Sequence, residues 1–358
     1  MTFRTAYETQ AVKIAVHLFG RFAFVSLFFF VILQIDNLAN CIMTITELIQ
    51  GQGTAFSFEV LPPKKGEGIE ELERTVETLL PYGPKYINIT THHSEPVYKR
   101  LDNGLVEVEM VRRRPGTVAV AAALQYKYNI PIVPHILCSG FTKEETEYVL
   151  LDLQFLGISN VLLLRGDKNR NDEQFRAEPD GHQHTTELQE QVNRFNGGLF
   201  ANGQPIPSPG VPFDYGVACY PEKHDEAPNL ASDIAWFKRK IERGASYGVT
   251  QMFFDNSKFF DFVDRVRKEG IEVPIIPGIK PITSQKQLTT IPRSFHCDIP
   301  EAFTREMMKA ETKEAQFQVG VEWAVAQCKE LMRAGVPSIH FYTTGQARSV
   351  NEVAKQIY

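Results

Sequence analysis

The chain has 358 residues, of which 43% are hydrophobic and 23% are charged. This composition is that of an ordinary globular protein and excludes disordered, fibrous and collagen-like classes. A chain of this length buries about 75% of the surface that its extended form exposes, so it needs no disulfides or metal ions to stay folded. The net charge of −5 argues against a nucleic-acid binder, whose domain is usually strongly basic, and favours small-molecule chemistry.

The first 42 residues contain an apolar run, Phe22–Ile35, with Arg21 before it and Asp36 after it. The run is 14 residues long, whereas a membrane-spanning helix needs about 20. A signal-peptide core or a packed helix fits that length better, although no clear small-residue cleavage site follows it. We therefore expect residues 1–42 to be a hydrophobic N-terminal extension, with a working start at Met43 and no membrane as partner.

From Thr54 onward, short apolar runs alternate with helical patterns, which is typical of βα units around a parallel sheet. Eight segments have the length and composition of strands: Thr54–Val60, Lys85–Thr91, Pro131–Cys138, Asn160–Arg165, Asp214–Tyr220, Thr250–Asp255, Val273–Ile279 and Ser338–Thr343. Eight strands with helices between them predict an α/β fold, a (β/α)8 TIM barrel, over residues 43–358. An open doubly wound sheet is the alternative, but no strand here leads into GxGxxG.

Glu59 lies near the end of the first strand. Alternation along this strand puts Phe56 and Phe58 on one face and Glu59 on the other, which in a barrel points inward. Chemistry in such barrels takes place at the carboxyl ends of the strands. A carboxyl there would be partly desolvated, which raises its pKa and lets it act as a general acid near neutral pH. An ion pair with a barrel-lining Lys or Arg is the alternative role for Glu59.

The fourth strand ends in Leu164-Arg165-Gly166-Asp167, where an apolar run stops in two opposite charges around a glycine. Such charges rarely end an internal strand unless a ligand is their partner or they pair with each other. The pattern therefore favours Arg165 and Asp167 as site residues.

Other polar residues inside the expected strands have two possible roles, one structural and one in ligand binding. His135 lies in the third strand, where a lone histidine is more often a hydrogen-bonded core residue than a ligand. Gln251 lies in the sixth strand and needs partners, because an unmet buried amide costs about 1 to 3 kcal/mol, and a ligand could supply them. The pairs His92-His93 and His182-Gln183-His184 lack the Cys or carboxylate neighbours of a zinc spacing, so no metal is expected.

The cysteines fit a reducing compartment. There are 5 of them, an odd number, and they are widely spaced with no CxxC: Cys41, Cys138, Cys219, Cys297 and Cys328. A disulfide framework would need even, regular spacing. We expect the protein to be cytoplasmic.

Taken together, nine segments resemble the methylenetetrahydrofolate reductase family. They occur in the family's order from about Met43 to the C-terminus: Phe58–Pro63, Asn88–Thr90, Pro134-His135, Leu164–Asp167, Tyr220–His224, Ile234–Lys240, Thr250–Asp255, Ile276–Ile279 and His340–Thr343. Each segment alone is a weak signal, whereas all of them in one order at barrel-like spacing are a strong one. The chain resembles the short bacterial form, which consists of the catalytic domain.

The resemblance implies a (β/α)8 barrel that holds FAD noncovalently at the strand ends. It also implies a ping-pong reaction. NADH or NADPH passes hydride to FAD and leaves, and methylenetetrahydrofolate then takes the hydride at its bridging carbon, giving 5-methyltetrahydrofolate for methionine synthesis. A homo-oligomer is expected.

The resemblance also assigns residues. Glu59 matches the general acid that protonates N10 of the folate, Asp167 matches the acid beside the flavin and the pterin, and Gln251 matches a glutamine that contacts the folate and the nicotinamide in turn. FAD-binding positions fall on Thr90, His135, Arg165, Gly166, Asp167, His184, Tyr220, His224, Asp233 and Lys240. Of these, Arg165 and Lys240 suit the pyrophosphate and Asp233 suits a ribose hydroxyl.

Three positions depart from the family pattern. Gln346 replaces an arginine that contacts the folate tail, His184 replaces a tyrosine that packs on the FAD adenosine, and Ile291 replaces an aromatic near the pterin. Gln287 aligns with a substrate-side glutamine, but Ser284–Gln287 is also a capping box.

Two alternative functions stay open on the sequence. A metal- or Schiff-base-dependent barrel lyase would need a lysine inside a strand, and the expected strands contain only Lys85, at an amino-terminal end. A barrel that binds flavin or folate without turnover is the other alternative, and the pair Glu59 and Asp167 argues against it.

Overall fold

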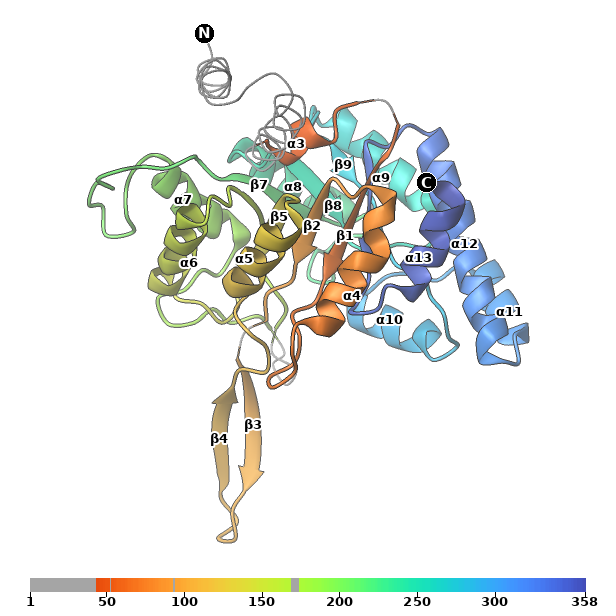
Figure 1. Cartoon of the computed structure of the whole chain (residues 1–358), viewed down its shortest axis with the longest axis horizontal. Coiled ribbons are helices and arrows are strands. Elements are labelled where there is room, and N and C mark those ends of the chain that lie inside the picture. The colour runs from red at the N-terminus through yellow and green to blue at the C-terminus, as the bar shows by residue number, and fades with distance from the viewer. Residues whose placement is uncertain (1–42, 52, 93, 169–173) are drawn as a thin grey trace, which may run out of the picture.

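The computed structural model describes residues 43–358 except 52, 93 and 169–173 (Figure 1). The apolar run Phe22–Ile35 and Cys41 lie outside the described residues. Among the helices of the described part, none has the length and apolar character needed to cross a membrane.

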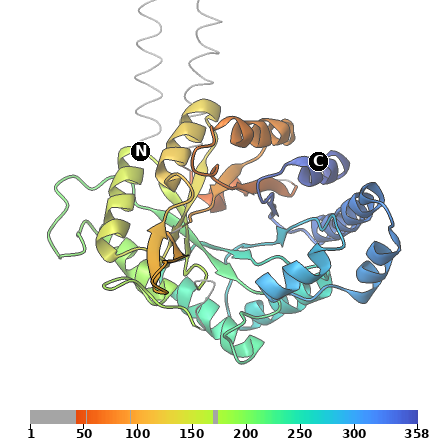
Figure 2. The same cartoon turned by 90° about the horizontal axis from the view of Figure 1, so that it is seen from below.

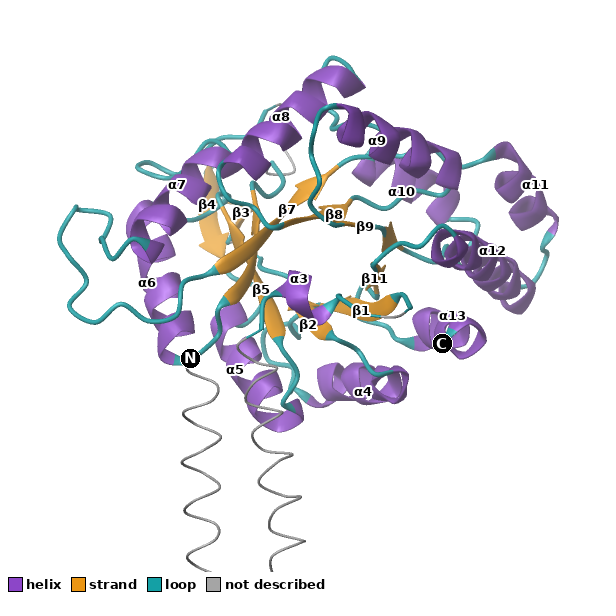
Figure 3. Ribbon diagram, turned by 90° about the horizontal axis from the view of Figure 1, so that it is seen from above, coloured by secondary structure: helices purple, strands orange, loops and turns teal. Residues whose placement is uncertain are grey.

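The strands form a ring of parallel neighbours with helices outside it, which confirms the predicted barrel (Figure 3). Around the ring the order is β10-β11-β1-β2-β5-β6-β7-β8-β9. The bounds are β1 Ala55–Val60, β2 Tyr86–Ile89, β5 Ile132–Leu137, β6 Asn160–Leu164, β7 Asp214–Cys219, β8 Tyr247–Thr250, β9 Ile275–Ile276, β10 Gly278–Ile279 and β11 Ser338–Tyr342. The ring excludes the open doubly wound sheet.

The seventh predicted strand is split into β9 and β10 at Pro277. Proline has no N–H for the ladder, so pairing changes there: β9 pairs with β8, and β10 pairs with β11. The side chain of Thr250 accepts the Gly278 N–H at 2.9 Å, which satisfies the backbone at the break. Two half-strands thus fill one position of the ring.

The prediction for the sixth strand was wrong. The strand is Tyr247–Thr250, and Gln251 onward forms the connection to the next helix. The apolar residues that suggested a strand are buried without a ladder, because Gln327 and Trp323 of α12 donate to the carbonyls of Phe253 and Phe254 at 2.9 and 3.1 Å. Asp255 ends the connection as a helix N-cap.

A hairpin that the sequence reading did not predict follows β2. Its strands β3, Glu95–Arg100, and β4, Val106–Val111, pair antiparallel and project from the barrel (Figures 1 and 2). The hairpin lies at the end of the barrel opposite to α3, Ile45–Leu48. Because α3 directly precedes β1, it lies at the amino-terminal ends of the strands. The hairpin therefore lies at their carboxyl ends.

Helices cover the outer face of the ring: α4 Glu70–Leu79, α5 Thr117–Tyr128, α6 Lys143–Phe155, α7 Thr185–Asn196, α8 Leu230–Glu242, α9 Asn256–Lys268, α10 Gln287–Phe295, α11 Glu301–Lys309, α12 Lys313–Arg333 and α13 Arg348–Ile357. The main core lies between these helices and the outward side chains of the strands. A smaller core fills the amino-terminal part of the barrel, where Ile45 and Ile49 pack on Tyr86 and Tyr247. The carboxyl ends are left for polar side chains.

The alternation predicted for β1 is confirmed. Phe56 and Phe58 are buried in the main core, whereas Ser57 turns inward and hydrogen-bonds His340 Nδ1 at 3.0 Å. Glu59 follows two residues later and shares the inward face. Burial of the aromatic residues therefore fixes where the carboxyl points.

Position 278 has room only for glycine, because Tyr342 crosses the barrel there and donates to the Thr250 carbonyl at 2.6 Å. A Cβ on Gly278 would lie 2.4 Å from that carbonyl oxygen and 2.5 Å from the Tyr342 ring. We predict that Gly278→Ala destabilises the protein by about 1 to 3 kcal/mol, as overpacking does. Gly116→Ala is the control, since nothing lies within 4 Å of its Cβ position. Thermal unfolding of the two variants measures this, and equal midpoints would contradict it.

Candidate active site

Two groups of polar side chains gather at the carboxyl ends of the strands. The first surrounds Glu59 on β1 and draws on β2, β5, β10 and β11. The second surrounds Arg165 and Lys240 and draws on β6, β7 and α8. Because β5 and β6 are neighbours in the ring, the two groups lie on adjacent arcs of one rim.

Glu59 is nearly buried, with 13% of its side chain exposed. Its register partners are Asn88 on β2 and Tyr342 on β11. Its Oε2 lies 3.8 Å from His135 Nε2, and its backbone carbonyl accepts from Thr343 Oγ1 at 2.6 Å. The carboxyl is therefore held inside the mouth of the barrel with little access to water.

Burial raises the pKa of Glu59 to about 8, against a smaller opposing effect of the positive charge on Lys280. Removing a carboxylate from water disfavours its charged form, and one cation nearby does not offset this cost. Glu59 is thus protonated at neutral pH. The result agrees with the acid expected there.

His135 is neutral at physiological pH. Burial lowers its pKa to about 3, with a further contribution from His92. Its Nε2 lies 3.1 Å from the amide nitrogen of Asn88, and since that amide only donates, Nε2 is the acceptor. The other amide atom, Asn88 Oδ1, is buried and accepts no hydrogen bond within the described residues. An acceptor is therefore available beside the acid.

Lys280 is the functional side chain that the sequence reading missed. It directly follows β10 and is 9% exposed, and its Nζ donates to Thr344 Oγ1 at 2.8 Å. Burial lowers its pKa to about 8, while the charge of Glu59 acts in the opposite direction. Lys280 lies one residue past the predicted strand Val273–Ile279. The signal that could have found it is a charge directly after an apolar strand, the pattern used for Arg165.

The second group is held by a network around a half-buried lysine. Lys240 on α8 donates to the Ala218 carbonyl at 3.0 Å, and its Nζ lies 6.0 Å from the centre of the Tyr220 ring. Asp233, about two turns earlier on α8, is 8% exposed and accepts from the His224 N–H at 3.0 Å. Tyr220 and His224 pack edge to face with ring centres 4.8 Å apart. These four predicted cofactor residues are thus brought together.

Arg165 joins this group, but its partner was not predicted. Its guanidinium forms two hydrogen bonds to Glu226, at 2.5 and 2.9 Å, and lies 4.8 Å from the Phe175 ring centre. It does not pair with Asp167, because Gly166 turns the chain at φ 82° between them. Of the two alternatives considered for these strand-end charges, a ligand or each other, mutual pairing is therefore not found.

Asp167 is exposed at the rim. Its backbone carbonyl accepts from Ser139 Oγ at 3.3 Å, and its charge contributes to raising the pKa of Tyr220 after the larger effects of burial and Asp233. The carboxylate therefore lies within electrostatic range of the second group.

His184 lies at the edge of the second group. It is the N-cap residue of α7, and its ring stacks on Trp236 of α8 with centres 5.6 Å apart and an angle of 28° between the planes. Trp236 is 40% exposed. An aromatic surface is thus present where the family pattern has a tyrosine.

The remaining predicted residues lie apart from these groups or have local partners. Thr90, just after β2, contacts His92 Nε2 at 3.3 Å. Gln251 bonds its own loop, since its Oε1 accepts from the Met252 N–H at 2.9 Å. Gln287 Oε1 accepts from the Thr283 N–H at 2.7 Å, so it braces the start of α10 without forming the box expected with Ser284.

The other departures from the family pattern have different surroundings. Ile291 is buried in the small core under α10 and α11, and Gln346 is exposed in the loop after β11. The histidine pairs do not form a metal site among the described residues, where no three His, Cys, Asp or Glu side chains are arranged around a common point. His182 is buried, with its Nε2 2.5 Å from Gln191 Oε1.

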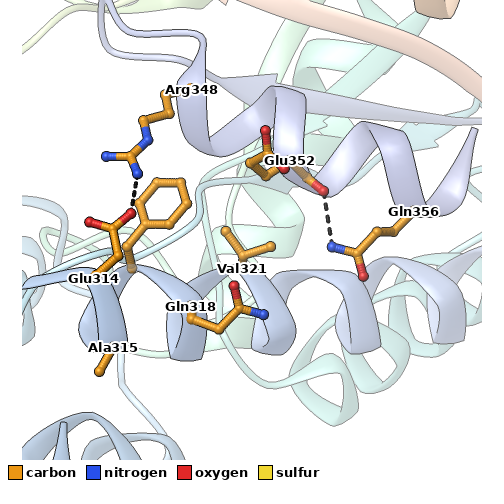
Figure 4. A pocket seen from close by; sticks show the side chains of 8 residues that line it. Glu314, Ala315, Gln318, Val321, Arg348, Glu352 and Gln356 are labelled. Carbon is orange, nitrogen blue, oxygen red and sulfur yellow. Dashed lines mark hydrogen bonds and ion pairs between the residues drawn. The ribbon is translucent and has the colours of Figure 1, made fainter.

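A groove between α12 and α13 is separate from both groups (Figure 4). Its main charges satisfy each other, because Arg348 pairs with Glu314 and lies over the Phe317 ring. The groove belongs to the outer helical layer, so it is not part of the candidate site.

The second group has the chemistry of a dinucleotide site. Arg165 and Lys240 are cations suited to phosphates, Asp233 is a buried acceptor suited to a hydroxyl, and the His184 and Trp236 rings offer a stacking surface. The donor set present therefore fits FAD. For Arg165, binding a phosphate would mean exchanging or sharing its contacts with Glu226.

Comparison with known proteins assigns the family. The methylenetetrahydrofolate reductase family model matches residues 44–358. The methylenetetrahydrofolate reductase (NADH) 1 of Arabidopsis thaliana is 31% identical over 318 residues, which cover 86% of this chain and 48% of that protein. The chain thus spans about half the length of the plant relatives it matches.

A bacterial relative and a solved structure are similar over most of their length. The 5,10-methylenetetrahydrofolate reductase of Escherichia coli (strain K12) is 28% identical over 84% of this chain and 88% of its own. A Clostridium thermocellum protein solved with two copies of 5-methyl-5,6,7,8-tetrahydrofolic acid has a TM-score of 0.52 and 14% identity, over 87% of this chain and 97% of that one. The structural likeness supports the fold. With its family match over residues 44–358, the chain belongs to the methylenetetrahydrofolate reductase family.

Proposed function

We propose that this protein reduces 5,10-methylenetetrahydrofolate to 5-methyltetrahydrofolate with FAD and NADH or NADPH, in a ping-pong reaction. The single observation that carries the proposal is Glu59, an acid with a pKa of about 8 inside the mouth of the barrel. Membership of the family supports the choice of substrate. The reaction needs a proton donor at neutral pH, and this carboxyl is one.

FAD would be held by the second group: Arg165 and Lys240 at the phosphates, Asp233 and His224 at the ribose, and Tyr220 and His184 at the rings. When bound, FAD supplies a carrier that takes hydride from the nicotinamide and delivers it to the folate. Gly166 provides the positive φ of the turn after Arg165 and packs against Ser139, and Thr90 and His135 would extend the binding surface toward Glu59. This chain's contribution would be to hold the nicotinamide and then the folate against one face of the flavin.

Glu59 would act before the hydride arrives. The carboxylic acid gives its proton to N10 of methylenetetrahydrofolate, the bond between N10 and the bridging carbon breaks, and an iminium forms between that carbon and N5. The bridging carbon then takes the hydride, and Glu59 remains as a carboxylate until it regains a proton. A neutral His135 beside it adds no charge that would ionise the acid too early.

Asp167 and Gln251 would orient the substrates. The exposed carboxylate of Asp167 suits the amino edge of a pterin, and the Gln251 amide suits the folate and the nicotinamide in turn. Gln287 would contribute on the folate side through its Nε2, since its Oε1 accepts from the Thr283 N–H.

The remaining parts of the proposal concern the whole chain. We assign residues 43–358 to the FAD-binding catalytic domain and residues 1–42 to an N-terminal extension. The protein would be a cytoplasmic homo-oligomer that supplies methyl groups for methionine synthesis. The start of the family match at residue 44 supports the domain boundary.

A Schiff-base lyase gains one specific observation, since Lys280 is a buried lysine with a lowered pKa. Its amine donates to Thr344, and the chain belongs to the reductase family. The reductase accounts for the acid, the cationic group and the family together, so we prefer it.

The direct test is the colour of the protein. We expect the purified full chain to carry a flavin spectrum, NADH or NADPH to bleach it without oxygen, and methylenetetrahydrofolate to restore it. Lys240→Met should lose most of the bound flavin, while Lys238→Met, which alters an exposed lysine on the same helix, should keep it. A folded protein that binds no FAD after reconstitution would refute the proposal.

Glu59→Gln should separate the two half-reactions. Flavin reduction by the nicotinamide needs orientation and no proton from Glu59, so its rate should be nearly unchanged. The folate step should slow by roughly 10² to 10⁴, the range for a lost general acid. Stopped-flow absorbance resolves both steps, with Glu301→Gln as a surface control. Equal losses in both steps, or none in the folate step, would reject Glu59 as the acid.

Asp167→Asn should keep the fold and the flavin but make the flavin easier to reduce, because a negative charge near the reduced carrier is removed. Folate turnover should weaken as well. A redox titration against wild type measures the potential, and Asp264→Asn, on the outer face of α9, is the control. An unchanged potential with normal folate kinetics would leave Asp167 a structural role alone.

A further inference from the structure

Lys280 follows β10, which β11 separates from Glu59 on β1. The reaction steps described above give Lys280 no role. We propose that Lys280 is a positioning residue for the general acid: its ammonium group stabilises the carboxylate left on Glu59 after proton transfer and so sets the pH range of the folate step. This inference rests on the proposed function, which assigns that proton transfer to Glu59.

The strand register puts the two side chains at one level of the barrel. On one side of β11, Glu59 pairs with Tyr342; on the other, Ile279 pairs with Phe341, so the next residue, Lys280, stands level with Tyr342. Neighbours in register on parallel strands point to the same face. Glu59, Tyr342 and Lys280 therefore form one row that faces the interior across three neighbouring strands.

Among the described residues, the group that balances the charge of Lys280 is Glu59 after it has lost its proton. Lys280 is 9% exposed, and its hydrogen bond to Thr344 Oγ1 at 2.8 Å uses one of the three donors of an ammonium group. Thr344 is neutral, so it cannot balance the charge. Glu59 is the charged group that acts on the lysine, and the lysine is the charged group that acts on Glu59.

The other side chains facing Glu59 carry no charge near neutral pH. From β2 comes the amide of Asn88; from β5 comes His135, and from β11 come His340 and Tyr342. Burial lowers the pKa of both histidines to about 3 and raises that of the Tyr342 phenol well above its usual value. His92 acts on His135 and not directly on Glu59. Among the described residues facing Glu59, Lys280 is thus the cation.

The charge of Lys280 lowers the free-energy cost of forming a buried carboxylate at Glu59. A buried carboxyl holds its proton well at neutral pH, but giving the proton away leaves an isolated carboxylate in a site with little water. A cation in the same row lowers that cost without ionising the acid beforehand. The lysine therefore makes Glu59 both protonated at rest and able to release its proton.

The direction of the pH effect follows from the active form. The folate step needs protonated Glu59, so it is lost as the pH rises through the pKa of Glu59. Lys280 lowers that pKa while its ammonium group is charged, that is, below its own pKa of about 8. Removing the lysine should therefore move the alkaline limb of the folate step to higher pH and slow the step below it.

The experiment compares Lys280→Met and Lys280→Gln with wild type in the full-length protein carrying its flavin. Stopped-flow rates of both half-reactions are measured from pH 6 to 10, and infrared difference spectra against Glu59→Gln follow the protonation of Glu59 without any substrate. Lys85→Met is the matched control, because Lys85 is an exposed lysine at the opposite end of β2. Lys280→Arg tests whether a cation of another shape restores the profile.

We expect both Lys280 variants to keep flavin reduction, to slow the folate step at least tenfold at pH 7, and to raise its alkaline midpoint and the infrared midpoint of Glu59 by about one unit or more. Unchanged midpoints in both variants, or equal slowing of both half-reactions, would overturn the role of Lys280. Failure of the proposed function is a separate result: wild type would then not turn over the folate, while the infrared midpoints would still report on Lys280.

Discussion

The structure depends on the burial of one carboxyl group. Glu59 points into the barrel because Phe56 and Phe58 on the same strand are buried in the core between strands and helices. A strand has two faces, so the aromatic residues leave the carboxyl no outward position. Desolvation then raises the pKa of Glu59 to about 8. Packing of the fold thus produces a proton donor at neutral pH.

The polar side chains at the carboxyl ends of the strands form two neighbouring groups with different chemistry. Around Glu59, neutral side chains and Lys280 determine the pKa of the carboxyl. Around Lys240, cations, a buried Asp233 and aromatic rings form a surface suited to a dinucleotide. The adjacency of β5 and β6 puts His135 and Arg165 on consecutive strands. A carrier bound on the second arc could therefore face a substrate that is protonated on the first.

The sequence predicted the features that rest on local periodicity. The barrel, the inward direction of Glu59 and the gathering of Tyr220, His224, Asp233 and Lys240 follow from strand alternation and from the resemblance. The sixth strand was misplaced, because the carbonyls of Phe254 and Phe253 accept from side chains of α12 that lie 69 and 74 residues away. No local pattern contains that information. The hairpin at 95–111 was missed since its apolar side chains are exposed, as Tyr98 and Val108 are.

Charge partners were the least predictable part of the site. Arg165 pairs with Glu226, which lies 61 positions along the chain, and Lys280 reaches the level of Glu59 only because the ring closes through β11. The ion pair with a barrel-lining Lys or Arg considered for Glu59 is not found among the described residues, since Lys280 acts on the carboxyl through its charge without a contact within 4.0 Å. The cation is present, and the carboxyl is protonated beside it.

The central claim is that Glu59 holds a proton at neutral pH in the resting protein. Carbon-13 NMR of glutamate carboxyls in the full-length protein, with Glu59→Gln to assign the signal, measures this directly. The account predicts a Glu59 signal that stays in its protonated position through pH 7 and titrates near pH 8. A signal that is already ionised at pH 6 would contradict it.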